Sequence, residues 1–475
     1  MQRLLYLLVA ASVFLMNTQH AIKIPVGKRA LNLGVVDIVI WVAFGLWAIS
    51  ALIKRNFFRS KLPPVAFIAL PVLAILSFLR HSDMGAAKEV FQFVEYFIIA
   101  VLLFMNLADN ETKLRGLISV FLLAVSAAVV WGLIDYVSAA SIFTAGGAFG
   151  NINVLGAYFA VALPLALGVA LFDDLKTWQR ISLVATVALG AAITLSGAAL
   201  AATLAGLLLV LALRSPRVLL PLGLVAATLG ITVLPRVLRP NHAKIVTSSA
   251  AVYLQNNYLL DEDQLLERAH ALYDDGRYFD ARRALQLIDD EDKLTGEGEK
   301  LWDSVEEKLR GRGPSEAAVP YDRPVVAMRY KSWQGALNAI VDNPWGHGMG
   351  TYQESLLYGK IRTFGYRTDE IEAFNIGIDQ PDTFNRFLVI TVELGLPGLM
   401  AFLWLYLWAL ARSVRLFGVA KSGLARGVAA GATASLAFLP IVAAYSDVIV
   451  RGVALPLVFI ICCVHILGKE ETQPE

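Results

Sequence analysis

Long apolar runs, separated by short polar clusters, make up most of this chain. Many of the runs approach the roughly 20 residues that a helix needs to cross the hydrocarbon core of a bilayer. The pattern therefore predicts an all-α polytopic membrane protein with about twelve transmembrane helices. The expected spans are residues 3–19, 34–53, 63–80, 91–108, 115–136, 153–172, 181–195, 197–213, 217–235, 386–411, 427–446 and 452–467.

Basic residues between the runs predict an orientation. With the N-terminus in the cytoplasm, every short basic loop falls inside, including residues 54–61, 113–115 and 412–426. This is the positive-inside pattern of membrane proteins. The apolar run that begins at Leu4 is interpreted as a retained first helix rather than a cleaved signal peptide, because the later charges then agree. The C-terminus is also expected inside, and residues 236–385 outside.

The predicted spans divide the chain into three parts. Residues 1–235 form an N-terminal membrane domain with about nine spans, and residues 386–475 a C-terminal one with about three. Between them, residues 236–385 form a large extracytoplasmic helical loop, too long for a plain connector.

Within that loop, residues 261–310 resemble one helical hairpin of tetratricopeptide (TPR) type, because apolar positions recur at helical spacing on both sides of Gly276. A single hairpin cannot bury its own apolar face, so we expect it to pack on the rest of the loop. Its role stays open between extending the loop surface and docking a partner.

Composition narrows the class of protein further. The chain is 57% hydrophobic and 17% charged, whereas soluble domains contain about a quarter charged residues. A net charge of +2 argues against a nucleic-acid partner. The only cysteines, Cys462 and Cys463, are adjacent within an apolar run, so neither a disulfide nor a metal framework is implied.

Basic and aromatic residues are concentrated in the second half of the outer loop. Cations on the outer side run against the positive-inside bias, and an anionic ligand would explain them, because arginine binds phosphate bidentately. Aromatic faces suit sugar rings. Ordinary salt bridging with acids of the loop stays open for each cation. The residues concerned are Arg329, Lys331, Arg362, Arg367, Trp333, Trp345, Tyr352 and Phe364.

Three stretches in order carry a resemblance to a known family. Residues 329–350 contain Arg-x-x-x-Trp and then Asp-Asn-Pro-Trp-Gly-His-Gly-Met-Gly. Residues 385–398 contain Asn-x-x-Leu and then Glu-Leu-Gly-Leu-Pro-Gly, and residues 150–153 read Gly-Asn-Ile-Asn. On this topology the three stretches resemble the O-antigen ligase and polymerase family.

The resemblance implies a GT-C-like fold and a glycosyltransferase reaction. Members transfer a glycan from undecaprenyl pyrophosphate to an acceptor at the periplasmic face of the bacterial inner membrane. The acceptor is lipid A core for a ligase and another lipid-linked glycan for a polymerase. The implied reaction is inverting and needs no metal or other cofactor. The implied partners are the lipid-linked glycan, the acceptor and membrane lipid.

Candidate binding residues follow from the resemblance. Cations are expected to hold the pyrophosphate, because fixed positive charge stabilises a departing anion. Asparagines are expected to position substrate, with helix capping as an equal alternative. The pyrophosphate-binding candidates are Arg329 and Arg386, then Lys331 and Arg451, and the positioning candidates are Asn385 and Asn153.

The catalytic base departs from the family pattern. Phe384 occupies the position of the family histidine and cannot accept a proton. Asp382 and His347 are the candidate replacements. Three hypotheses stay open: an active transferase with a replaced base, an inactive relative that binds lipid-linked glycan, and a membrane transporter. A transporter often carries internal repeats, and the chain shows no clear inverted repeat.

Overall fold

A computed structural model gives the architecture in two compact units. One comprises residues 1–224, 342–352 and 382–475, and the other residues 225–341 and 353–381. The predicted three-part division stays a prediction. The structure describes residues 1–16, 21–26, 29–54, 61–80, 84–108, 110–138, 147–149, 151–194, 196–215, 217, 262–274, 278, 281, 285, 296–309, 325–352, 385–444 and 451–471.

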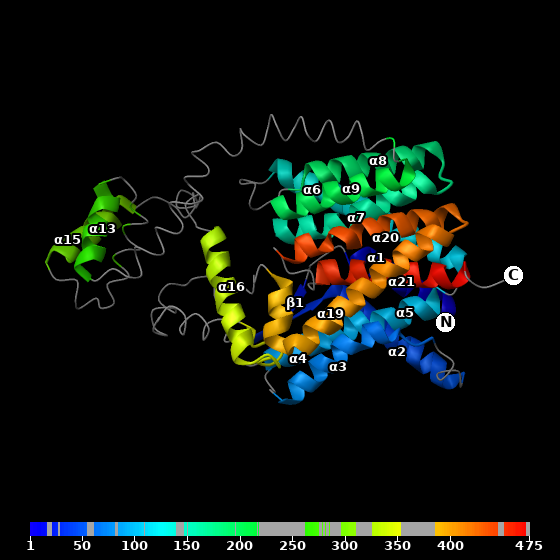
Figure 1. Cartoon of the computed structure of the whole chain (residues 1–475), viewed down its shortest axis with the longest axis horizontal. Coiled ribbons are helices and arrows are strands. Elements are labelled where there is room, and N and C mark those ends of the chain that lie inside the picture. Colours follow the sequence, from blue (N-terminus) through cyan, green and yellow to red (C-terminus); the bar gives the residue numbers. More distant parts are fainter. Residues whose placement is uncertain are drawn as a thin grey trace. The chain divides into compact units, whose positions relative to one another are not determined.

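The first unit is a bundle of apolar helices (Figure 1). Its helices are α1 (Gln2–Leu15), α2 (Val35–Ile53), α3 (Val65–Arg80), α4 (Met84–Val94), η2 (Glu95–Ile99), α5 (Ala100–Leu107), α6 (Glu111–Ser138), η4 (Gly147–Phe149), α7 (Ile152–Phe172), α8 (Thr177–Ala192), α9 (Gly197–Arg214), α19 (Arg386–Val419), α20 (Gly423–Ala443) and α21 (Arg451–Glu470).

These helices overlap the predicted spans closely enough to confirm a multi-pass membrane protein. Eight helical stretches among the described residues are long and apolar enough to cross a bilayer, whereas α1, α3 and α8 are shorter. The predicted span at 217–235 lies almost entirely outside the described residues. The total of twelve therefore stays a prediction.

The fold is predominantly helical, as predicted, and the described residues add one two-stranded hairpin between α1 and α2. Strands β1 (Ala21–Val26) and β2 (Arg29–Gly34) are antiparallel, and Ala21 pairs with Gly34. Each strand is six residues long. A period-two signal this short is hidden between two apolar runs of span length, so the hydrophobic pattern did not indicate it.

Helices α7 and α20 form the centre of the bundle and approach each other closely (Figure 1). A Cβ atom on Gly427 would lie 2.8 Å from the carbonyl oxygen of Gly168, and one on Gly431 would lie 2.7 Å from that of Pro164. Small residues allow such backbone approach between membrane helices, where dispersion contacts drive association.

Hydrogen bonds bring several predicted cytoplasmic loops to one end of the bundle. The Tyr6 hydroxyl donates to the carbonyl oxygen of Lys113 at 2.9 Å, and the Arg115 guanidinium donates to the Asp173 carboxylate at 2.7 Å. These residues lie at the starts of α1 and α6 and the end of α7. Their grouping agrees with the predicted loops, whereas the side of the membrane stays a prediction.

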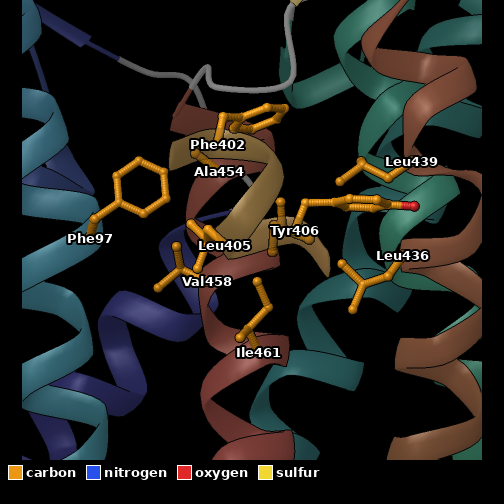
Figure 2. A pocket seen from close by; sticks show the side chains of 10 residues that line it. Phe97, Phe402, Leu405, Tyr406, Leu436, Leu439, Ala454, Val458 and Ile461 are labelled. Atoms are coloured by element: carbon orange, nitrogen blue, oxygen red, sulfur yellow. The ribbon is translucent and has the colours of Figure 1, made fainter. Parts of the chain in front are cut away.

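The bundle core contains a small void of about 20 Å³ between η2, α19, α20 and α21. Figure 2 shows Tyr406 of α19 beside Leu436 and Leu439 of α20. Its lining is almost wholly apolar, and a buried water needs two to four polar partners. We therefore interpret it as a packing gap and not as a ligand site.

The second unit contains α13 (Glu262–Asp274), α15 (Glu297–Leu309) and most of α16 (Val325–Asp342). Apolar residues on both sides of the predicted turn share a core with α15, which covers the face that one hairpin would leave open. The TPR type itself stays a prediction. The buried residues of this core are Ala269, Leu272, Ala281, Leu285, Leu301 and Val305.

Candidate functional site at the break in helix α19

Helix α19 is interrupted at Gly395, where φ is 70° and ψ is −172°. In a regular helix the carbonyl groups of Val392 and Glu393 would accept hydrogen bonds from residues 396 and 397. The Leu396 amide donates elsewhere, and Pro397 has no N–H to donate. Two carbonyl groups inside an apolar helix therefore lose their helical donors.

A turn at residues 343–350 supplies the missing donors. The backbone N–H of His347 donates to the Val392 carbonyl oxygen at 2.8 Å, and that of Gly348 donates to the Glu393 carbonyl oxygen at 3.1 Å. An unsatisfied backbone group in a lipid environment costs several kcal/mol. The turn thus replaces part of the helical hydrogen bonding of α19.

The two backbones meet so closely that only glycine fits. The Leu396 N–H donates to the Pro344 carbonyl oxygen at 2.9 Å. A Cβ atom on Gly346 would lie 2.6 Å from the Gly395 nitrogen. Both glycines have positive φ, at 93° and 70°, a region that other residues rarely adopt. The glycines of two separate motifs therefore serve one contact.

Side chains hold the turn in shape and tie it to α3. The Asn343 amide donates to the Gly346 carbonyl oxygen at 2.7 Å, and its own carbonyl oxygen accepts from the Trp345 backbone at 3.3 Å. The Met349 N–H donates to the Ser77 hydroxyl oxygen of α3 at 2.8 Å. The turn is thus bound to two helices.

Arg386 is a buried cation at the first residue of α19. It is 5% exposed, and its guanidinium carbon lies 5.8 Å from the centroid of the Phe93 ring. This is cation–π geometry. A buried charge in an apolar bundle is costly and usually functional. The Asn385 side chain caps the same helix by accepting a hydrogen bond from the Leu388 amide at 3.2 Å. Of the two roles predicted for Asn385, helix capping is the one that the structure shows.

The structure gives less information on the other predicted site residues. Asn153 lies in the first turn of α7, but the capping side chain there is that of Asn151, which accepts from the Asn153 amide at 2.8 Å. Asp382 and Phe384 lie outside the described residues. Helix α16 carries Arg329 and Lys331, and α21 begins at Arg451, but the structure does not describe these three side chains.

Two buried residues near the break were not predicted as site residues. Glu393 is 3% exposed, and a buried acid within an apolar span is a signal that would have identified it. The Tyr352 hydroxyl is buried without a hydrogen-bond partner among the described residues. Burial raises the pKa of Tyr352 above its ordinary value, and the nearby Glu393 charge raises it further. Tyr352 was predicted only as one of the aromatic residues of the outer loop, and nothing in the sequence indicated its burial.

Comparison with known proteins agrees with the motifs. The family model described as O-antigen ligase matches residues 181–403. The match includes the 343–350 turn and the break at Gly395. It confirms the family resemblance that the motif order predicted. The chain has no significant match among curated proteins.

Proposed function

We propose that this protein, whose residues 181–403 match the O-antigen ligase family, transfers a glycan from undecaprenyl pyrophosphate to a saccharide acceptor at the periplasmic face. The observation that carries the proposal is the contact between two family-like motifs. The His347 and Gly348 amides bind the carbonyl groups at the α19 break. A turn whose backbone is hydrogen-bonded to α19 suits a site that orients two large substrates.

Arg386 is the proposed contact for the pyrophosphate leaving group. Charge develops on the diphosphate as its bond to the sugar breaks, and a fixed cation in a low-dielectric site stabilises that charge. The position of Arg386 at the start of α19 suits a phosphate that lies where the helix enters the bilayer. The further proposed contacts are Arg329, Lys331 and Arg451.

His347 and Asp382 are the proposed general bases. In an inverting transfer the acceptor hydroxyl oxygen attacks the anomeric carbon, the bond to the diphosphate breaks, and the hydroxyl proton passes to the base. His347 lies in the turn that the Val392 carbonyl anchors, so its backbone position relative to α19 is set. An aspartate would serve if partial burial raised its pKa.

A deletion strain assayed for surface polysaccharide tests the proposal. Complete but unattached lipid-linked chains would identify a ligase, and single repeat units a polymerase. Unchanged glycans would exclude both activities. Complementation with His347→Ala and with Asp382→Asn would then identify the base, because only the variant that lacks it loses transfer while its membrane level stays normal.

An inactive relative that binds lipid-linked glycan is the second candidate, and Phe384 in place of the family histidine favours it. Such a protein would bind the lipid-linked donor without releasing undecaprenyl pyrophosphate. Purified full-length protein incubated with donor and acceptor distinguishes the two, since only an active enzyme forms a new glycosidic bond.

A further inference from the structure

A groove of about 340 Å³ opens between the C-terminal end of α3, the 343–350 turn and the break in α19. The turn contributes Trp345, Gly346 and Gly348, and α19 contributes Leu394 and Pro397. The groove is therefore lined by residues of both family-like motifs. His347, one of the proposed bases, lies between the two glycines that line it.

Helix α3 lines the groove with one continuous stripe. Leu76 and Ser77 lie three and four residues after Leu73, and Arg80 lies four and three residues after them, so the four residues share one face of the helix. The stripe changes from apolar to polar towards the C-terminal end of α3. Its chemistry matches an amphipathic ligand that has an apolar chain and an anionic head.

Arg80 is available to such a ligand. It is exposed in the last turn of α3, and within the part of the chain that the structure describes it makes no ion pair. Trp345 is 72% exposed at the same groove. A guanidinium group binds phosphate oxygens through two parallel hydrogen bonds, and an indole ring can pack on a sugar face or a lipid chain.

We propose that this groove binds the phosphate end of the polyprenyl carrier, with Arg80 as a phosphate-binding residue and Leu73 and Leu76 packed on the first isoprene units. The proposal rests on the proposed function and adds a binding residue to it. A bulk phospholipid would meet the same charge, but a wall built from the motif turn beside His347 favours the carrier. The phosphate would then lie next to one of the proposed bases.

Binding of undecaprenyl pyrophosphate to the full-length protein in phosphatidylcholine nanodiscs tests the proposal. Because it removes charge-assisted hydrogen bonds to the phosphate, Arg80→Ala should raise the Kd roughly tenfold or more. Arg80→Lys should have a smaller effect, since it keeps the charge but loses the bidentate geometry. Leu76→Trp should weaken binding by filling the groove, and Leu76 is 56% exposed, so this variant should fold.

Arg415→Ala is the matched control, because Arg415 is an exposed arginine near the other end of α19. Its Kd should stay within about twofold of wild type, as expected for an exposed cation outside the groove. Unchanged affinity in both Arg80→Ala and Leu76→Trp would overturn the proposal. Equal competition by phosphatidylglycerol would also overturn it, by showing that the groove binds bulk anionic lipid.

A separate transfer assay keeps the two proposals distinct. Arg80-dependent binding without any glycan transfer by wild type would leave the groove proposal standing and remove the proposed transferase activity. Transfer by wild type together with normal carrier binding by Arg80→Ala and Leu76→Trp would support the proposed transferase activity and overturn the groove proposal.

Discussion

Gly348 donates its backbone N–H to the carbonyl oxygen of Glu393 at 3.1 Å, where Pro397 removes the helical donor. A loop residue thereby completes the hydrogen bonding of a membrane helix. A break in such a helix is tolerated where other groups satisfy the freed backbone. Residues far apart in the chain therefore depend on each other.

The closest backbone contact predicts that Gly346→Ala disconnects the turn. The new Cβ would lie 2.5 Å from the Glu393 carbonyl oxygen, and a positive φ costs a non-glycine residue about 1–2 kcal/mol. We expect a lower thermal midpoint and loss of glycan transfer. Gly418→Ala, which adds a Cβ to α19 with nothing within 4 Å, should keep the thermal midpoint and the transfer activity of wild type. Equal stability in the two variants would contradict the tight contact.

Replacement of Arg386 should impair transfer more than it impairs folding. If its guanidinium binds the leaving group, Arg386→Ala should lower kcat/KM by about 10- to 100-fold, because a charged hydrogen bond contributes about 1.5–3 kcal/mol. Arg386→Lys should retain part of the activity. Initial transfer rates at normal membrane levels measure this.

Arg412→Ala is the control for that experiment, because Arg412 also lies over an aromatic ring, with its guanidinium carbon 5.6 Å from the Trp408 centroid. It lies near the opposite end of α19 and should leave transfer unchanged. Loss of activity in Arg412→Ala equal to that in Arg386→Ala would point to a shared structural role.

The buried Tyr352 hydroxyl predicts a pH effect on stability. Because its folded pKa is raised, the unfolded chain loses the phenolic proton first, near its ordinary pKa of about 10. The contribution of the protonated Tyr352 hydroxyl to the free energy of unfolding is therefore complete below about pH 10 and is lost as the pH rises further. Tyr352→Phe should show a smaller decline in thermal midpoint between about pH 9 and pH 11. Parallel curves for the two proteins would contradict this.

The contact between α7 and α20 predicts sensitivity to a single added methyl group. A Cβ on Gly431 would lie 2.7 Å from the Pro164 carbonyl oxygen, and overpacking costs about 1–3 kcal/mol. Gly431→Ala should lower the thermal midpoint in detergent. Gly45→Ala in α2, with nothing within 4 Å of the new Cβ, should be neutral or slightly stabilising. A lower thermal midpoint for Gly45→Ala than for Gly431→Ala would contradict the close packing of α7 and α20.

The separate core of the second unit predicts a local effect of mutation. Leu301 is 4% exposed and belongs to the same buried core as residues from both sides of the predicted hairpin turn. Leu301→Ala should remove about 2–5 kcal/mol of packing. We expect faster proteolysis near residues 262–309 and an unchanged thermal midpoint for the membrane unit. Glu299→Ala, at an exposed position of the same helix, should leave both measurements unchanged.

The hydrophobic pattern predicted the membrane helices well because each one depends mainly on local composition. Helix α7, predicted at 153–172 and found at Ile152–Phe172, is typical. The motifs were also visible in the sequence, but the contact between them was not predicted. It joins Gly346 to Gly395 through backbone groups, and a backbone contact leaves no periodic pattern of side chains in the sequence. Arg80 was missed since one arginine at the end of an apolar helix resembles a snorkelling residue.

The 343–350 turn gives the long segment between α9 and α19 an extra point of attachment to the first unit, ahead of α19 itself. Closure entropy rises only slowly with loop length, so extra residues before the turn add little to the cost of bringing the turn to α19. The 261–310 insert can therefore vary in length at little cost to the contact between Gly346 and Gly395.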